Sequence, residues 1–330
     1  MSALFITGIG GFIGKRLAEL ALARGMRVSG LDRDAHAIAA VQRLGVEAHV
    51  ADICDSARAT RLLAGVNAVV HTAALVKEYG PLDVFRKINV EGSRSMALAA
   101  RAAGVRSFVH LSSVMVYGFS YPEGVDENGP LRGENNPYCQ TKIESEGAVL
   151  ALNAPPDFGV IVVRPGDVYG PGSVPWVERP LAMLRKKRLF LPAGGRGVIN
   201  PVYVDNLIDG IFMALDARAH GEVFNLTDGH AVAYRDYFGK LAERAGLPQP
   251  RSLPTALMKG LAFGIQTARK LGLTGDEASV DTVRYLSRRH AYSIAKAERV
   301  LGYSPRVGLD EGLARTQAFI DALGDKGENS

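Results

Sequence analysis

The first half of the sequence alternates short apolar runs with longer segments of helical periodicity, and this alternation limits the fold more than any other feature. Parallel strands need a crossover segment to join them, so the pattern predicts β-α-β units and a parallel sheet. The runs are apolar on both faces, as expected when helices cover both sides of the sheet. We predict strands at 4–7, 27–31, 47–51, 68–71, 107–111 and 160–163, and helices at 12–24, 35–44, 56–63, 84–103 and 138–152.

After Arg164 the pattern loosens, because prolines and glycines interrupt it repeatedly. A helix around 205–215 and a strand around 222–226 indicate a return to the sheet. The remainder, from about Ala231, is mostly helical. We interpret it as a smaller lobe that closes over the first domain.

Composition excludes several classes of protein. With 330 residues and 47% hydrophobic content, the chain can bury a full core without disulfides or a structural metal. Cys54 and Cys139 lie far apart and form no ligand motif, and no histidine or carboxylate spacing indicates a metal site. The net charge of +5 is spread along the chain without a nucleic-acid-binding module. No signal peptide pattern or apolar run of about 18 residues is present, so a cytoplasmic protein is expected.

A glycine-rich segment, Thr7 to Gly14, follows the first predicted strand and opens the first predicted helix. Its spacing is T-G-x-x-G-x-x-G, with Gly8, Gly11 and Gly14 at the marked positions. Glycines let the backbone approach a pyrophosphate, whose charge then meets the free N–H groups and the dipole at the helix start. In this strand-turn-helix context the segment predicts dinucleotide binding.

Asp32 ends the second strand, where a carboxylate accepts hydrogen bonds from the adenosine ribose. A 2′-phosphate would be repelled there, so NAD is favoured over NADP, although the neighbouring Arg33 is a group that accommodates phosphates. Asp52 and Ile53 close the third strand, where the adenine is expected, and a plain strand-end turn is the alternative.

Tyr138 and Lys142 are four residues apart, which places a phenol and an ammonium on one face of a helix. A free tyrosine has a pKa near 10, too high for proton exchange at neutral pH. A nearby lysine cation, helped by an oxidised nicotinamide, favours the phenolate and is expected to lower that pKa. Tyr138 is therefore the candidate acid/base.

Ser113 lies where the fifth strand emerges at its carboxyl end, the edge at which open α/β sheets bind ligands. Its hydroxyl is placed to hydrogen-bond a substrate oxygen. Ser112 points to the other face and is interpreted as structural.

These segments together resemble the extended short-chain dehydrogenase/reductase superfamily, which includes NAD-dependent epimerases and dehydratases. The motifs occur in the expected order, from the glycine segment and Asp32 through 71–74, 89–92, Ser113, Tyr138 with Lys142, and 164–165. The resemblance implies a Rossmann-type doubly wound parallel sheet, formed by residues 1–165 and 201–228. It implies a mostly helical C-terminal substrate lobe of residues 166–200 and 229–330, and a homodimer.

The resemblance also implies roles for individual residues. Tyr138 would be the acid/base, Lys142 would bind the ribose and tune Tyr138, and Ser113 would orient the substrate. The cofactor, NAD rather than NADP, would contact Gly8, Gly11, Phe12, Ile13, Gly14, Asp32, Arg33, Asp52, Ile53, Ala73, Ala74, Tyr138, Lys142 and Pro165.

The choice of subfamily depends on fewer residues. Val114 and Met115 stand where dehydratases carry Asp-Glu, so elimination chemistry is not expected. Ile199 stands where nucleotide-sugar epimerases have a diphosphate-binding arginine, although Arg196 lies nearby. Residues 204–206 and the segments 292–297 and 301–305 are similar to the 3β-hydroxysteroid dehydrogenase and sterol-4-carboxylate 3-dehydrogenase branch.

We therefore expect oxidation or reduction at a secondary alcohol or ketone, with the 3-hydroxyl of a steroid or a similar apolar lipid as the candidate substrate group. Ser113, Val114, Tyr169 and Trp176 are the candidate substrate residues, with loop packing as the alternative for the two aromatic ones. A nucleotide-sugar 4-epimerase and a non-catalytic NAD-sensing module are the competing hypotheses. An apolar helix at 253–273 and the basic cluster 185–188 leave open a weak contact with a membrane surface.

Overall fold

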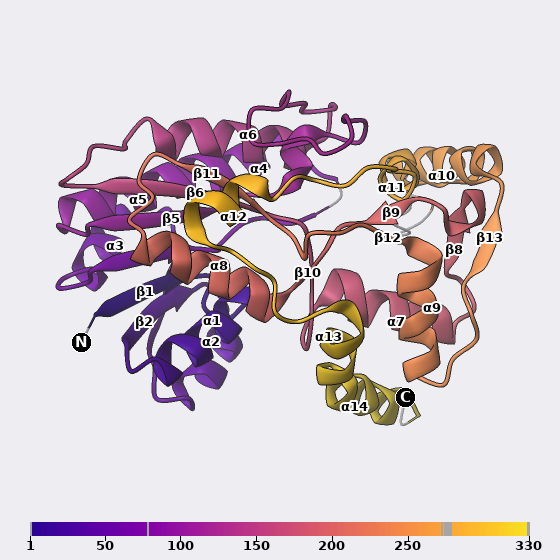
Figure 1. Cartoon of the computed structure of the whole chain (residues 1–330), viewed down its shortest axis with the longest axis horizontal. Coiled ribbons are helices and arrows are strands. Elements are labelled where there is room, and N and C mark those ends of the chain that lie inside the picture. Colours follow the sequence, from indigo (N-terminus) through magenta and orange to yellow (C-terminus); the bar gives the residue numbers. More distant parts are fainter. Residues whose placement is uncertain (1, 78, 272, 274–278, 329–330) are drawn as a thin grey trace.

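Seven parallel strands form the central sheet of the computed structural model, which describes residues 2–77, 79–271, 273 and 279–328 (Figure 1). Their order is β11-β6-β5-β4-β1-β2-β3. This order turns back after β1, as in a doubly wound Rossmann-type sheet, and confirms the predicted fold class. The strands are β1 (Ala3–Thr7), β2 (Arg27–Asp32), β3 (Glu47–Val50), β4 (Ala68–His71), β5 (Ser107–Leu111), β6 (Gly159–Pro165) and β11 (Val223–Leu226).

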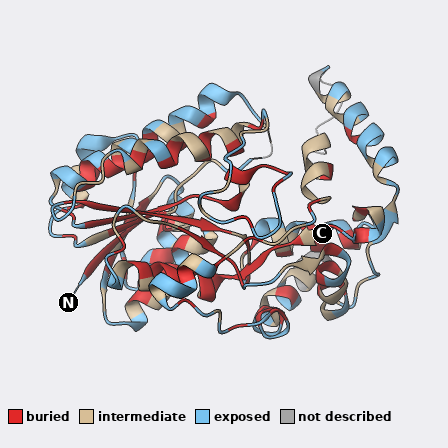
Figure 2. Ribbon diagram, turned by 45° about the horizontal axis from the view of Figure 1, so that its top comes forward, coloured by how far each residue is buried: buried red, intermediate tan, exposed pale blue. Residues whose placement is uncertain are grey.

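Helices cover both faces of this sheet, and each face has its own apolar core (Figure 2). Leu4 and Ile6 of β1 belong to one core and Phe5 to the other, because side chains alternate along a strand. The first core includes residues of α1 (Phe12–Ala23), α2 (Ala35–Gln42) and α8 (Val204–Asp216). The second includes residues of α3 (Ser56–Leu62), α5 (Ser93–Ala102) and α6 (Pro137–Leu150).

The helix predicted at 84–103 is helical but not uniform. It consists of α4 (Leu82–Phe85), a π-helical segment (Arg86–Gly92) and α5. A π-helical segment accommodates one extra residue per turn and is frequent at functional sites. Apolar periodicity did not predict this change of winding.

The remaining elements form the C-terminal lobe and its connections. Three small strand pairs occur there, β7 with β10 and β8 with β13 in parallel, and β9 with β12 antiparallel. The predicted apolar helix at 253–273 corresponds to α10, and residue 272 of that range lies outside the described residues. In the described ranges, no helix is both long and apolar enough to cross a membrane. The elements are β7 (Asp167–Tyr169), a π-helical segment (Val174–Glu178), α7 (Arg179–Arg185), β8 (Phe190–Pro192), β9 (Val198–Ile199), β10 (Pro201–Tyr203), β12 (Val232–Ala233), α9 (Tyr234–Arg244), β13 (Arg251–Leu253), α10 (Thr255–Lys270), α11 (Val280–Tyr285), α12 (Ala295–Leu301), α13 (Leu309–Arg315) and α14 (Gln317–Glu328).

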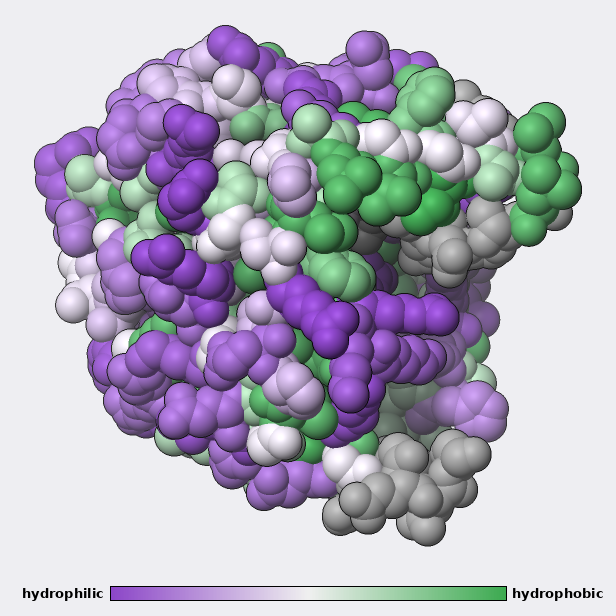
Figure 3. Space-filling model, turned by 90° about the vertical axis from the view of Figure 1, so that its right-hand side faces the viewer, coloured by the Kyte–Doolittle hydropathy of each residue, from purple (hydrophilic) through white to green (hydrophobic). Residues whose placement is uncertain are grey.

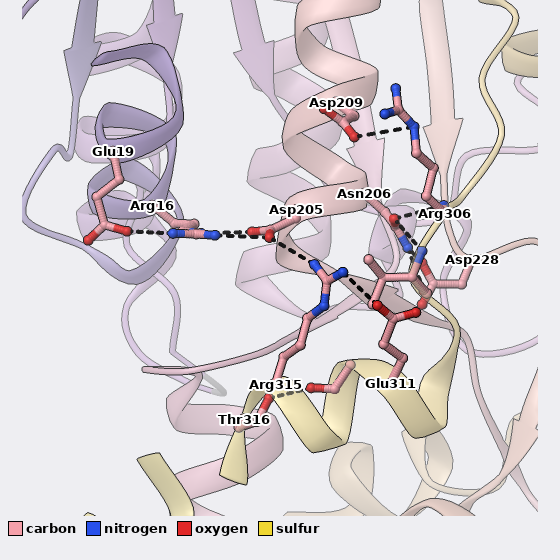
Figure 4. Close-up of polar contacts among 12 residues, drawn as sticks. Arg16, Glu19, Asp205, Asn206, Asp209, Asp228, Arg306, Glu311, Arg315 and Thr316 are labelled. Atoms are coloured by element: carbon pink, nitrogen blue, oxygen red, sulfur yellow. Dashed lines mark hydrogen bonds and ion pairs between the residues drawn. The ribbon is translucent and has the colours of Figure 1, made fainter. Parts of the chain in front are cut away.

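Asp205, at the start of α8, connects the two parts of the molecule (Figure 4). Its carboxylate accepts two hydrogen bonds from Arg16 of α1, at 2.8 and 3.0 Å, and lies 3.7 Å from Arg315 of α13. The next residue, Asn206, donates to the carboxylate of Asp228 at 2.7 Å and to the carbonyl of Val307 at 2.8 Å. The 204–206 segment therefore has a structural role in holding the C-terminal segment against the sheet domain.

Candidate active site

The glycine loop between β1 and α1 is closed so tightly that side chains do not fit. Gly8 has a φ of +66°, and a Cβ there would lie 2.9 Å from the backbone nitrogen of Ala73. A Cβ at Gly14 would lie 2.2 Å from the carbonyl oxygen of Gly8. Only glycine satisfies both positions, because the loop packs directly against the backbone of Ala73 and of its own first residue.

The start of α1 provides a site for an anion. Gly11 is the N-cap and carries no side chain, so the first N–H groups of the helix, at Phe12 and Ile13, have no side-chain cap. No acidic residue lies in the first turn. Free N–H groups and the positive end of the helix dipole suit a pyrophosphate, so these residues fit the dinucleotide that the sequence predicts.

Asp32 lies beside this loop at the end of β2. Its carboxylate accepts hydrogen bonds from the backbone N–H groups of Gly10 and Asp34, each at 3.1 Å. The side chain is half-buried, whereas Arg33 next to it is exposed. One oxygen of Asp32 thus faces the glycine loop, the position expected for a ribose-binding carboxylate.

The other predicted cofactor residues gather at the carboxyl ends of the strands. Asp52 is exposed in the turn after β3, and its carboxylate accepts the N–H of Cys54 at 2.8 Å. Ile53 is buried below it. Ala73 and Ala74 are half-buried in the segment after β4, and Pro165 is buried at the end of β6. The structure brings Ala73 against the glycine loop, as described above.

Ser113, Tyr138 and Lys142 come together between β5 and α6. Asn136 caps α6 by accepting the N–H of Tyr138 at 3.0 Å, which fixes where the helix begins. The Lys142 ammonium lies 5.9 Å from the centroid of the Tyr138 ring and donates to the carbonyl of Leu111 at 2.8 Å. The Ser113 hydroxyl accepts the N–H of Met115 at 3.1 Å, and it lies near enough to the Tyr138 phenol to favour ionisation of that phenol. Tyr138 is half-buried, so its ring is neither isolated in the core nor free in solvent.

The pKa of Tyr138 differs from the sequence-based expectation. Burial raises it to about 12, and the hydrogen bond with Ser113 opposes that rise. We expected Lys142, helped by an oxidised nicotinamide, to lower this pKa, whereas the side chains around Tyr138 give a net upward shift. The physical reason is that desolvation of the phenolate outweighs the stabilising groups around it.

Lys142 is buried, and burial lowers the pKa of its ammonium to about 8, while the charge of Glu146 raises it. At neutral pH the group is still mainly protonated. Its charge is thus retained close to Tyr138 in a poorly solvated position, where electrostatic interactions are strong.

A buried ion pair joins α6 to β6, and the sequence analysis did not identify it. The carboxylate of Glu146 receives two hydrogen bonds from Arg164, at 2.9 and 2.7 Å. It also accepts the Ser112 hydroxyl at 2.5 Å, which confirms the structural interpretation of Ser112. Tyr138, Lys142 and Glu146 follow one another at intervals of four residues, so they lie along one face of α6. This spacing was the sequence signal that could have identified Glu146.

Asn89, in the π-helical segment, connects three parts of the site. Its amide donates to the Thr141 hydroxyl at 3.1 Å and to the carbonyl of Leu75 at 3.2 Å, and it accepts the N–H of Leu75 at 2.7 Å. The extra residue in this turn places the amide between the segment after β4 and helix α6. Asn89 therefore positions the helix that carries the phenol.

The predicted substrate residues lie in different environments. Val114 is buried next to Ser113. Tyr169 is completely buried, edge-on to Tyr203 and Tyr237, and its position favours the packing alternative that the sequence left open. Trp176 is half-buried and stacks on Tyr285 at a centroid distance of 6.0 Å.

A second buried ion pair joins β7 to the segment after α11. The Arg288 guanidinium lies 2.9 Å from the Asp167 carboxylate and donates to the Tyr234 hydroxyl at 2.8 Å. Tyr285 also donates its hydroxyl to Asp167. Arg288 is completely buried, and its charge is paired with that of Asp167 inside the protein. No sequence pattern relates Asp167 to a residue 121 positions later.

Comparison with known proteins places the chain among NAD-dependent enzymes. The model of the NAD dependent epimerase/dehydratase family matches residues 4–227. The 4-hydroxy-2-methyl-3-oxo-4-farnesyl-3,4-dihydroquinoline-1-oxide ketoreductase of Stigmatella aurantiaca is 30% identical over 314 residues, which cover 94% of each chain. A 2-alkyl-3-oxoalkanoate reductase of Stenotrophomonas maltophilia is 28% identical, across 96% of this chain and 98% of the relative.

Steroid and sugar enzymes are also similar to this chain. The 3 beta-hydroxysteroid dehydrogenase/Delta 5-->4-isomerase of Mycobacterium tuberculosis is 26% identical, across 100% of this chain and 93% of the relative. Among solved structures, a dTDP-glucose 4,6-dehydratase from Streptomyces venezuelae with NAD bound superposes with a TM-score of 0.77. The two are 26% identical and the match covers 97% of both chains.

Proposed function

The chain belongs to the NAD dependent epimerase/dehydratase family, and from this premise we propose that it interconverts a secondary alcohol and a ketone on a bulky apolar substrate. The observation that carries the proposal is the grouping of Ser113, Tyr138 and the buried Lys142, whose ammonium lies 5.9 Å from the centroid of the Tyr138 ring. The three groups lie at the carboxyl edge of the sheet, where parallel α/β sheets bind their ligands.

Each of the three residues has a distinct role in this proposal. Tyr138 exchanges a proton with the substrate oxygen, and Ser113 donates a hydrogen bond to that oxygen and stabilises its developing charge. Lys142 stabilises the phenolate that is left after a proton has been donated. When bound, NAD supplies or accepts the hydride. The pKa of Tyr138, raised to about 12, supports a phenol that is protonated at neutral pH and ready to donate to a ketone.

Glycine-loop residues and Asp32 bind the dinucleotide in this proposal. The close approach at Gly8 and Gly14 and the uncapped start of α1 support pyrophosphate binding. The carboxylate of Asp32 supports NAD over NADP, because a 2′-phosphate would be repelled there. Arg33, which is exposed, remains the group that would weaken this preference.

The substrate class rests on the relatives and on the cations of the C-terminal lobe. The relatives' names describe ketones or alcohols on farnesyl, alkyl or steroid skeletons. A nucleotide sugar would need cations for its diphosphate. Ile199 carries no charge and Arg288 is paired with Asp167, so neither residue supports diphosphate binding, whereas the exposed Arg196 supports a 4-epimerase.

The experiment is a spectrophotometric assay of NADH with three kinds of compound. We would test an apolar β-keto ester, a 3-ketosteroid and UDP-glucose, each with wild type and with Tyr138→Phe. Consumption of NADH with either ketone, lost in the variant, supports the proposal. Isomerisation of the sugar nucleotide without net change in NADH, and no turnover of the ketones, would establish the epimerase instead.

A further inference from the structure

Helix α10 presents its apolar side chains to solvent. Leu257, Leu261 and Phe263 are exposed by 50, 52 and 65%, and Leu271 just beyond the helix is exposed by 69%. We call these four residues the α10 apolar face. Figure 3 shows hydrophobic side chains gathered in the upper part of the face of the molecule on which α10 lies.

Unlike an ordinary surface helix, α10 has large apolar side chains on its exposed side as well as on its packed side. A helix of a soluble protein turns its apolar stripe toward the core and its charged side toward water. In α10 the side that packs on the protein includes Ala262, 3% exposed, and the half-buried Met258, Ile265 and Arg269. Leu257 and Leu261, one turn apart, point outward. Several exposed large apolar side chains on one helix mark a candidate interaction surface.

The chain segment that carries α10 is basic. From residue 244 to residue 275 the sequence contains five basic residues and no acidic one. Lys259 and Arg251 of this stretch are exposed. Strand β13, which leads into α10, pairs with β8, and β8 follows the basic cluster 185–188 directly. Arg251 and Lys187 line one shallow cavity, so the two basic segments meet at the base of the helix.

We propose that the α10 apolar face docks on an anionic lipid surface, with the basic residues at the base of α10 contacting the headgroups. An amphipathic helix of this composition lies in the plane of the interface, with its apolar side in the acyl region. Each basic residue near such a surface adds to the attraction. With 16 residues, α10 is about 24 Å long, which is too short to span a bilayer.

A second copy of the chain fits this face less well. In a two-fold symmetric contact the same patch meets itself, so the basic residues of both copies would be brought together. Like charges in contact are unfavourable, whereas lipid phosphates complement them. The charge pattern therefore favours lipid as the occupant.

The proposed surface is connected to the site described above. The Arg269 guanidinium, near the end of α10, lies 3.6 Å from the centroid of the Tyr79 ring. Tyr79 belongs to the segment after β4 that also contains Ala73 and Ala74. Docking would bring a lipid surface close to this segment, as suits an apolar substrate. The lipid contact itself goes beyond the oxidoreductase function and does not depend on it.

The test is co-sedimentation of the full chain with lipid vesicles, without cofactor or substrate. We expect binding to vesicles of phosphatidylcholine mixed with phosphatidylglycerol, little binding to phosphatidylcholine alone, and release at high salt. The L257Q/F263Q variant should bind anionic vesicles at least tenfold more weakly. The matched control is L44Q/L131Q, which changes two exposed leucines in other parts of the fold and should bind like wild type.

Three results would overturn the proposal. The first is no binding of wild type to anionic vesicles, and the second is equal loss of binding in the control variant. The third is a dimer that L257Q/F263Q converts to a monomer while vesicle binding is absent, which would assign the face to a second copy. Tyr138→Phe should bind vesicles like wild type, so failure of the catalytic proposal is distinguishable from failure of this one.

Discussion

The Lys142 ammonium donates a 2.8 Å hydrogen bond to the carbonyl of Leu111, the last residue of β5. This bond ties the face of α6 that carries Tyr138 to the end of the strand that leads, two residues later, to Ser113. The lysine thereby holds the helix that carries Tyr138 against the strand end that carries Ser113. Positioning of the phenol and the serine is thus built into the fold before any ligand binds.

Replacing Lys142 by methionine should stabilise the protein and inactivate it. Burial lowers the pKa of this lysine to about 8 from its ordinary value near 10.5. The unfolded chain therefore binds more protons between these values, and stability rises with pH across that window. Below it, burial of the charge costs about 3 kcal/mol. We expect Lys142→Met to raise the melting temperature at pH 7, by less at pH 10, and to lower kcat about 100-fold or more. Calorimetry and NADH kinetics measure both, and a lower melting temperature at pH 7 would contradict the electrostatic account.

Asp32→Ala should weaken NAD binding about 10- to 100-fold, because a charged acceptor of hydrogen bonds is worth roughly 1.5–3 kcal/mol. Affinity for NADP should fall less, since the repulsion of its 2′-phosphate is removed. Titration calorimetry with both cofactors measures this. The control is Asp34→Asn, which retains an acceptor for the N–H groups of His36 and Ala37 at the start of α2. Equal loss for NAD and NADP in Asp32→Ala would exclude the ribose contact.

Gly14→Ala should abolish NAD binding and lower stability. The new methyl group would lie 2.2 Å from the carbonyl oxygen of Gly8. The other nearest atoms are also backbone, of Gly8 and Ile9, so no small adjustment of a side chain can make room. Gly147→Ala in the last turn of α6 is the matched control, since nothing lies within 4 Å of its Cβ position. That substitution should stabilise the protein by about 0.5–1 kcal/mol. Chemical denaturation of both variants tests this, and a stable Gly14→Ala protein that still binds NAD would be inconsistent with the tight loop.

Glu146→Gln should destabilise the protein by about 3–5 kcal/mol, because it leaves the buried Arg164 guanidinium without a counter-charge. Urea unfolding measures the loss. The exposed pair of Arg86 with Glu144 on the same helix provides the comparison, and Glu144→Gln should cost less than 1 kcal/mol. Equal losses of stability in the two variants would show that burial does not determine how much these ion pairs contribute to stability.

The sheet, the glycine loop and the grouping of Ser113, Tyr138 and Lys142 could be predicted because each depends on local spacing. Apolar runs located the seven strands, and the interval from Tyr138 to Lys142 placed both side chains on one helix face. Contacts between distant segments could not be predicted in this way. The ion pair of Asp167 with Arg288 is such a contact, and it depends on how the C-terminal lobe folds back onto β7.

Two further features of the structure could not be predicted from local sequence patterns. The π-helical segment that holds Asn89 has the same apolar periodicity as an α-helix, so its extra residue leaves no trace in the sequence. The pKa of Tyr138 depends on desolvation, which is a property of the folded site and cannot be read from the spacing to Lys142.

The most direct test of the account is Tyr138→Phe, measured for both NAD affinity and single-turnover hydride transfer to an accepted ketone. Loss of one hydroxyl leaves the ring packing and the glycine loop in place, so the dissociation constant for NADH should stay within about twofold of wild type. The rate of hydride transfer should fall by roughly 10²–10⁴, the usual contribution of a positioned acid. A variant that binds NADH normally and transfers hydride at the wild-type rate would contradict the assignment of Tyr138 as the proton donor.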